Sequence, residues 1–134
     1  MEAGVRSTPW TFADFVPGSE LGRVAIAFDD ERLSAWRGIY GALPGGTVPA
    51  GAMLAAAMQA YLEAFRPRPP GNIHAAQKLA FGKERLKPGD RADAVVTCLA
   101  KELRKERHWV TFGVSIVKDG RDVLSGEMLL VWAM

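Results

Sequence analysis

The run AGAMLAAAMQAYLEAF, residues 50–65, constrains the fold more than any other part of the sequence. Alanine dominates it and Glu63 is its only charged residue, so the run predicts a helix without a polar face. Prolines and glycines precede it in LPGGTVP (43–49), and prolines stop it in RPRPP (66–70). A helix that is apolar on all sides is expected to be buried on all sides, and its small side chains let a sheet approach closely along its length.

The sequence on either side of this helix predicts a shorter helix and several strands. Residues 20–28 are β-branched and apolar, as in a strand, and 29–41 combine an N-cap candidate (Asp29 or Asp30) with apolar residues at helical spacing. The remaining strands are expected over 73–82, 92–105, 108–118 and 122–134, with a hairpin turn at Asp119-Gly120. Alternation in the strand at 108–118 predicts a core face formed by Val110, Phe112, Val114 and Ile116.

This order of elements predicts an α+β domain in which an antiparallel sheet wraps around the long helix. A helix of about 16 residues is about 24 Å long, and strands of about 10–12 residues span roughly 33–40 Å, so the strands can curve around it. Residues 1–19 are expected to form an N-terminal arm whose aromatic residues pack back on the domain at 20–134. Edge strands left exposed by such a sheet predict a homodimer or a higher oligomer, with a continuous sheet as one mode of pairing.

Composition and missing motifs exclude several classes of protein. The net charge of +2 is too small to indicate a nucleic-acid binder, and no apolar run indicates a membrane helix or a secretory signal. Cys98 is the single cysteine, so an intrachain disulfide is excluded and a reducing compartment, the cytoplasm, is expected. No Cys/His spacing indicates a metal site and no glycine-rich nucleotide motif occurs, so no cofactor is expected.

Residues 20–133 resemble the hotdog fold, the superfamily of acyl-thioester hydratases, dehydratases and thioesterases. Gly51-Ala52-Met53-Leu54 is similar to the His-Gly-Met-Leu helix start of the MaoC-like (R)-specific enoyl-CoA hydratases, and QKLAFGKERLKPGD (77–90) is similar to their strand and Pro-Gly-Asp turn. PGGTVPAGAMLAAAMQA (44–60) also resembles the loop and helix of the β-hydroxyacyl-ACP dehydratases. The resemblance implies a sheet wrapped around one central helix, and an acyl thioester of CoA or of acyl-carrier protein as ligand.

The sequence departs from both families where they carry their catalytic groups. ALPGG follows Gly41, so the Asp and His of the hydratase loop have no counterpart. Ala50 stands where the hydratases have a histidine before the helix glycine. In the dehydratase pattern the catalytic histidine falls on Ala42 and the helix glutamate on Ala56. Hydration of an enoyl thioester needs a positioned acid/base pair, and neither pair is present by motif.

Gly51 matches both families and lies at the expected start of the central helix. Backbone N–H groups point outward there and the helix dipole is positive, which favours an oxyanion hole for a thioester carbonyl. Ala50, Ala52 and Gly46 are the neighbouring candidates for substrate binding. The alternative is a tight turn that needs glycine for conformational reasons alone.

His74 and Glu63 are the candidates for catalysis. His74 opens the strand after the central helix and is a potential general base facing the helix of a neighbouring subunit; the alternative is a structural or exposed histidine. The resemblance implies that a helix carboxylate such as Glu63 activates water or attacks the thioester, as in some hotdog thioesterases, and the alternative is a surface ion pair with Arg66. His108 is expected to be solvated at a hairpin end.

Three basic clusters lie at expected turns or contain prolines, which favours solvated loops: RPRPP (66–70), KERLK (83–87) and LRKER (103–107). The functional alternative is contact with the phosphates of coenzyme A, for which the candidates are Arg66, Arg68, Lys83 and Arg85. Three hypotheses for function follow. The chain is a MaoC-like hydratase or dehydratase relative in lipid metabolism, an acyl-CoA thioesterase, or a non-catalytic acyl-binding or partner subunit of another hotdog protein.

Overall fold

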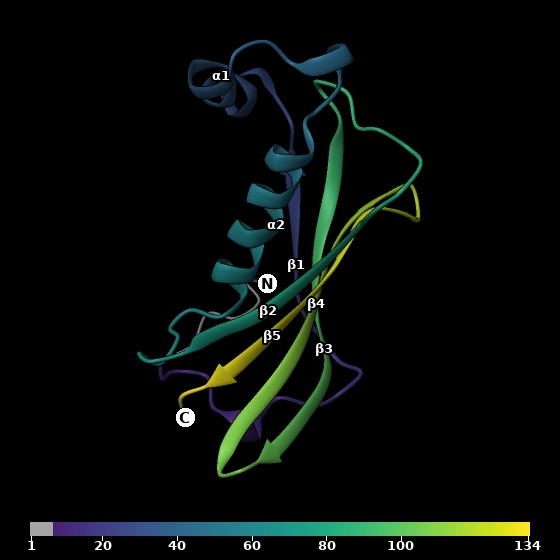
Figure 1. The fold of residues 1–134 in the computed structure, drawn as a ribbon. Helices are drawn as coiled ribbons and strands as arrows, with labels where there is room; N and C mark the ends of the chain where they lie inside the picture. The colour runs from purple at the N-terminus through teal and green to yellow at the C-terminus, as the bar shows by residue number, and fades with distance from the viewer. Residues whose placement is uncertain (1–6) are drawn as a thin grey trace.

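The structure is a computed structural model that describes residues 7–134, so residues 1–6 of the expected arm lie outside the described part. Five strands and two α-helices form the domain (Figure 1), with short 3-10 turns before β1 and before α2. The strands are β1 (Glu20–Ala27), β2 (Ile73–Phe81), β3 (Arg91–Arg104), β4 (Arg107–Lys118) and β5 (Arg121–Trp132). The helices are α1 (Asp30–Tyr40) and α2 (Ala50–Ala64). Each predicted helix and strand is therefore present, with ends that differ by no more than two residues.

The strands form one antiparallel sheet in the order β1-β3-β4-β5-β2. Its inner face carries the apolar residues that alternation in β4 predicts, and all of them are buried: Val110, Phe112, Val114 and Ile116. Partner residues on β3 and β5 continue this face, because directly paired residues share one side of a sheet. The α+β prediction and the antiparallel sheet are confirmed.

The helix α2 packs on the inner face over β1, β3 and β4, and Figure 1 shows β2 and β5 diverging from it. Most of its alanines are buried, and Ala56 and Ala60 are 0% and 1% exposed. The expectation of burial on all sides is wrong for the single chain. Gly51, Ala55, Gln59 and Leu62 form an exposed stripe, because the sheet curves over one side of the helix only.

Aromatic residues of the arm pack onto the end of the core at the C-terminus of α2. Phe15 is fully buried and its ring lies 4.9 Å from that of Trp132. Trp10 stacks on Phe15 at 5.6 Å and meets Phe65 edge-on at 5.5 Å. These contacts tie the arm to the sheet. Within the described residues no helix is long and apolar enough to cross a membrane.

Two hairpin turns connect β3 to β4 and β4 to β5. Asp119 and Gly120 have φ values of 52° and 75°, the conformation that the Asp-Gly pair predicts. Lys105 and Glu106 adopt the same left-handed conformation at 51° and 62°, although neither residue favours it. Tight pairing of the long strands therefore imposes this turn on an unfavourable sequence.

Candidate functional site

The amino end of α2 presents unpaired backbone donors. Pro49 is the N-cap residue, and its carbonyl accepts hydrogen bonds from the N–H groups of Ala52 and Met53 at 3.0 and 3.2 Å. In the described part of the chain, no acceptor is bonded to the N–H groups of Ala50 and Gly51. These groups point along the helix axis at its positive end, so they can donate to a carbonyl oxygen or an anion.

The indole of Trp36 lies on Gly51. A Cβ placed on Gly51 would lie 2.6 Å from Cη2 of Trp36, well inside the contact distance of two carbon atoms. Trp36 in turn packs on Tyr40 with ring centroids 4.2 Å apart. The glycine is therefore needed for close approach of a side chain of α1, and the indole forms one wall beside the free donors of α2.

A cavity of about 650 Å³ lies between α1, the start of α2 and the end of β1. Three of its lining residues are charged: Asp29, Glu31 and Arg32. The others are small or apolar: Ala27, Ala35, Trp36, Ile39, Ala52 and Ala55. Asp29 caps α1 by accepting the backbone N–H of Arg32 at 3.0 Å, as one of the two predicted N-cap residues. The volume lies in the range of small-molecule sites, and the cavity adjoins the helix end that carries Gly51.

Three polar side chains form a hydrogen-bonded row along the flank of α2 that faces β1. The guanidinium of Arg32 donates to the carbonyl of Ala27 at 3.2 Å and to Oε1 of Gln59 at 3.3 Å. Nε2 of Gln59 donates to Oε1 of Glu63 at 3.4 Å. A second cavity of about 180 Å³ borders all three side chains. In the described part of the chain Glu63 forms no ion pair with Arg66, so the surface-pair alternative is wrong and Glu63 faces a cavity instead.

The two histidines lie apart from the amino end of α2. His74 is exposed near the start of β2, opposite Leu130 and beside a bulge in the pairing. The ring of His108 stacks on that of Phe12 at 4.5 Å and is half-buried. The expectation that His108 is solvated is therefore wrong, because the arm covers it, and it has a packing role.

The four candidates for phosphate contact are exposed but are not brought together within one chain. Lys83 and Arg85 lie in the loop after β2, which is joined to the start of α2 by a hydrogen bond of 2.8 Å from the N–H of Val48 to the carbonyl of Leu86. Arg66 and Arg68 follow the other end of α2, a helix of 15 residues and hence about 22 Å away. Figure 1 shows the two loops at opposite ends of the sheet.

Other candidate residues are placed as follows. Ala42 and Gly46 are exposed in the loop before α2, whereas Ala56 is fully buried and borders the cavity of about 180 Å³ beside Gln59 and Glu63. Cys98 is buried as expected, and burial raises the pKa of its thiol. Among the described residues no group of His, Cys, Asp and Glu side chains is arranged to hold a metal ion.

Sequence reasoning missed Trp36, Arg32 and Gln59 as neighbours of the site. Their contacts join residues that lie 15 to 27 positions apart, as in the pair Arg32 and Gln59. Only Gln59 could have been recognised as a site residue from the sequence, because it is an isolated polar residue on an otherwise apolar stretch of helix.

The chain has the hotdog fold, as comparison with solved structures shows. The (R)-hydratase from A. caviae involved in PHA biosynthesis superposes with a TM-score of 0.66 at 22% identity, over 90% of this chain and 98% of that one. A mutant of the phenylacetic acid degradation protein PaaI from Thermus thermophilus has a TM-score of 0.60 at 18% identity, over 89% of both chains. HadBC, a (3R)-hydroxyacyl-ACP dehydratase complex from Mycobacterium tuberculosis, has a TM-score of 0.53 at 21% identity, over 75% and 71%. No family model and no curated protein matches the sequence.

Proposed function

We propose that this chain binds acyl thioesters, with the thioester carbonyl at the amino end of α2 and the acyl chain in the cavity between α1 and α2. The observation that carries the proposal is the pair of unbonded N–H groups on Ala50 and Gly51 beside a cavity of about 650 Å³. Several structures with this fold are named as hydratase, dehydratase or thioesterase, which supports the same class of ligand.

The helix end would polarise the carbonyl. A thioester oxygen gains negative charge when water or another nucleophile adds to the acyl group, and backbone donors at a helix amino end stabilise that charge. The indole of Trp36 would shield the same position from water on one side, since it already packs on Gly51. Burial of the acyl chain against Ala52, Ala55 and Ile39 would supply the apolar part of the binding energy.

Pairing of two copies would complete the site. All nine residues of β2 are exposed, and β2 is an edge of the sheet, so antiparallel pairing of two β2 strands is the homodimer we propose. Pairing centred near Gln77 would bring the His74 end of one strand beside the Phe81 end of the other. Arg66 and Arg68 of one copy would then approach the Lys83 and Arg85 end of the second, so that the four candidates for CoA phosphate contact meet across the interface.

The MaoC-like hydratase or dehydratase activity would need an acid/base group, and His74 of the second copy is the candidate. Thioester hydrolysis is the second candidate function, and the row Arg32–Gln59–Glu63 favours it. Gln59 holds one oxygen of the Glu63 carboxylate, and the cavity of about 180 Å³ beside it has room for water. A binding subunit without activity is the third. We place the protein in the cytoplasm, where Cys98 would remain a free thiol.

A thermal-shift panel tests the ligand class. Acyl-CoA is expected to raise the unfolding temperature, because a ligand that binds only the native state stabilises it, while CoA and free fatty acid serve as controls. Ala55→Phe fills the cavity and should abolish the shift, whereas Leu62→Phe, on the same exposed stripe but outside the cavity lining, should keep it. Equal shifts in the two variants, or none in the wild type with any acyl-CoA, would refute the proposal.

The activities are separated by their products. Hydration of a crotonyl-CoA-type substrate that is lost in His74→Gln supports the hydratase. Release of free thiol from acyl-CoA that is lost in Glu63→Gln supports hydrolysis, and Gln59→Leu should then lower kcat more than it changes KM, since Gln59 positions the carboxylate. Binding without turnover of any thioester supports the binding subunit.

A further inference from the structure

A single arginine side chain lies between two cavities beside α2. The first cavity, of about 650 Å³, adjoins the amino end of α2, and the second, of about 180 Å³, lies further along the helix beside Gln59 and Glu63. Among the described residues only Arg32 borders both of these cavities. A ligand that extends from the first cavity into the second must therefore pass the Arg32 side chain.

Two hydrogen bonds hold this side chain across the gap between β1 and α2. Its guanidinium donates to the carbonyl of Ala27, the last residue of β1, at 3.2 Å, and to Oε1 of Gln59 on α2 at 3.3 Å. Its Cζ also lies 6.0 Å from the centroid of the Phe28 ring. An arginine with partners on two different elements has little rotamer freedom left, so it forms a bar between the cavities.

The charge of Arg32 makes this bar difficult for an apolar chain to cross. Within the described residues the guanidinium forms no ion pair, and its two hydrogen bonds leave further N–H groups to water. An alkyl chain laid against these groups would remove that water without replacing its hydrogen bonds, which costs free energy. Loss of the contacts with Ala27 and Gln59 would add to the cost if the side chain moved aside.

The position of the bar along α2 limits the length of chain that the first cavity can hold. Gly51 and Gln59 are eight residues apart on α2, which corresponds to about 12 Å along the helix axis. C–C bonds of about 1.5 Å advance an extended alkyl chain by roughly 1.3 Å each. A chain that starts from a thioester carbonyl at Gly51 therefore reaches Arg32 after about eight to ten carbon atoms.

We propose that Arg32 sets the length of acyl chain that this protein accepts, so that chains of up to about eight carbon atoms fit in the first cavity and longer chains are kept out of the second. This inference rests on the proposed function, because it concerns the acyl chain of the thioester bound there. Truncation of Arg32 at Cβ would join the two cavities. Longer chains would then reach the apolar lining of the second cavity, which includes Val24, Ile26 and Ala60.

Acyl-CoAs of increasing chain length test the proposal by isothermal titration calorimetry. Each additional CH₂ that is buried should lower Kd about fourfold. In the wild type Kd should fall from butanoyl-CoA to octanoyl-CoA and then stay constant or rise. In Arg32→Ala the fall should continue, so that Kd for dodecanoyl-CoA is lower than in the wild type by about tenfold or more, while Kd for butanoyl-CoA is unchanged.

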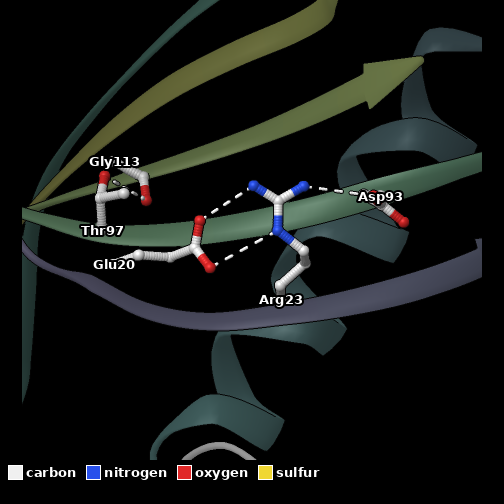
Figure 2. A network of polar contacts seen from close by, with 5 residues as sticks. All are labelled: Glu20, Arg23, Asp93, Thr97 and Gly113. Carbon is white, nitrogen blue, oxygen red and sulfur yellow. Dashed lines mark hydrogen bonds and ion pairs between the residues drawn. The ribbon is translucent and has the colours of Figure 1, made fainter. Parts of the chain in front are cut away.

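Arg23 offers a matched control for the loss of an arginine. Figure 2 shows its guanidinium between the carboxylates of Glu20 and Asp93, at 2.9 and 3.2 Å. Arg23 is thus also held by two partners beside β1, but it borders neither cavity. Arg23→Ala should therefore keep the wild-type dependence of Kd on chain length.

Two variants of Gln59 show which space the longer chains use. Gln59→Phe in the Arg32→Ala background fills the second cavity and should restore the wild-type limit. Gln59→Ala alone removes one of the two partners of Arg32 and should raise the limit, which keeps the test available if Arg32→Ala does not fold.

Two results would count against the inference in different ways. If acyl-CoA binds but Kd depends on chain length in the same way in the wild type, Arg32→Ala and Gln59→Ala, the role of Arg32 is overturned and the proposed function stands. If no acyl-CoA of any length binds to the wild type or to the variants, both are overturned.

Discussion

Gly51→Ala should lower the free energy of unfolding slightly when Trp36 is present and should raise it when Trp36 is replaced by alanine. Alanine favours a helix over glycine by about 1 kcal/mol. In the wild type this gain is opposed, because the new Cβ would lie 2.6 Å from the indole and the ring would have to retreat by about 1 Å. Overpacking costs about 1–3 kcal/mol, and the low end applies here because the contact is at the far edge of a partly exposed side chain. The net change should be a loss of about 0–1 kcal/mol.

In a Trp36→Ala background the same substitution should stabilise the protein by about 1 kcal/mol, since the obstructing ring is gone. The coupling free energy of the double-mutant cycle is therefore expected to be roughly 1–2 kcal/mol. Urea unfolding followed by circular dichroism measures it without depending on tryptophan fluorescence. Gly38→Ala is the matched control, because a Cβ on this α1 glycine meets nothing within 4 Å. A coupling below about 0.5 kcal/mol would refute the contact between Trp36 and Gly51.

Three further changes test other parts of the structure. Asp90 accepts the backbone N–H of Lys87 at 2.8 Å and pairs with Lys118 at 3.0 Å, and both contacts hold the pKa of its carboxyl below the usual value. Asp90→Asn should therefore lower the free energy of unfolding by about 1 kcal/mol at neutral pH. In urea unfolding this difference should vanish as the pH falls through the lowered pKa, because Asp90 then becomes protonated in the wild type. Within the described residues the buried Tyr61 hydroxyl forms no hydrogen bond of acceptable geometry, and burial raises its pKa to about 12 against a weaker opposing influence of the nearby Arg68 guanidinium. Tyr61→Phe should therefore leave the unfolding midpoint unchanged or raise it, and a clear loss would contradict this. Replacing Lys105 and Glu106 in the β3–β4 turn by Asn and Gly should raise the unfolding temperature and add about 1 kcal/mol to the free energy of unfolding, because Asn and Gly favour the left-handed conformation of this turn. An unchanged unfolding temperature would mean that the turn is unstrained.

The secondary structure followed from the sequence because its signals are local. Alternation in residues 108–118 identified the buried face of β4, and the Asp119-Gly120 pair identified a hairpin turn. Alanine content identified α2 as a packed helix, but it could not show which side the sheet would cover. Curvature of the sheet decides that, and it leaves Ala55 and Gln59 exposed.

The candidate site was predictable only in part. Gly51 was found from its place at the start of a helix, whereas the reason for glycine there, the indole of Trp36, comes from a contact between two helices. Glu63 is recognisable in the sequence as a lone carboxylate on the helix. Its hydrogen bond with Gln59, and that between Gln59 and Arg32, depend on how α1 packs beside α2. Such contacts are fixed by tertiary packing, which spacing along the chain does not reveal.

Amide chemical shifts measured while acyl-CoA is added test the central claim most directly. If the thioester carbonyl binds at the amino end of α2, the N–H signals of Ala50 and Gly51 should move furthest, toward the lower field expected of stronger hydrogen bonds, and that of Ala55 should follow. Coenzyme A without an acyl group should leave these signals in place. Binding of acyl-CoA that moves amides elsewhere while those of Ala50 and Gly51 stay fixed would contradict the account.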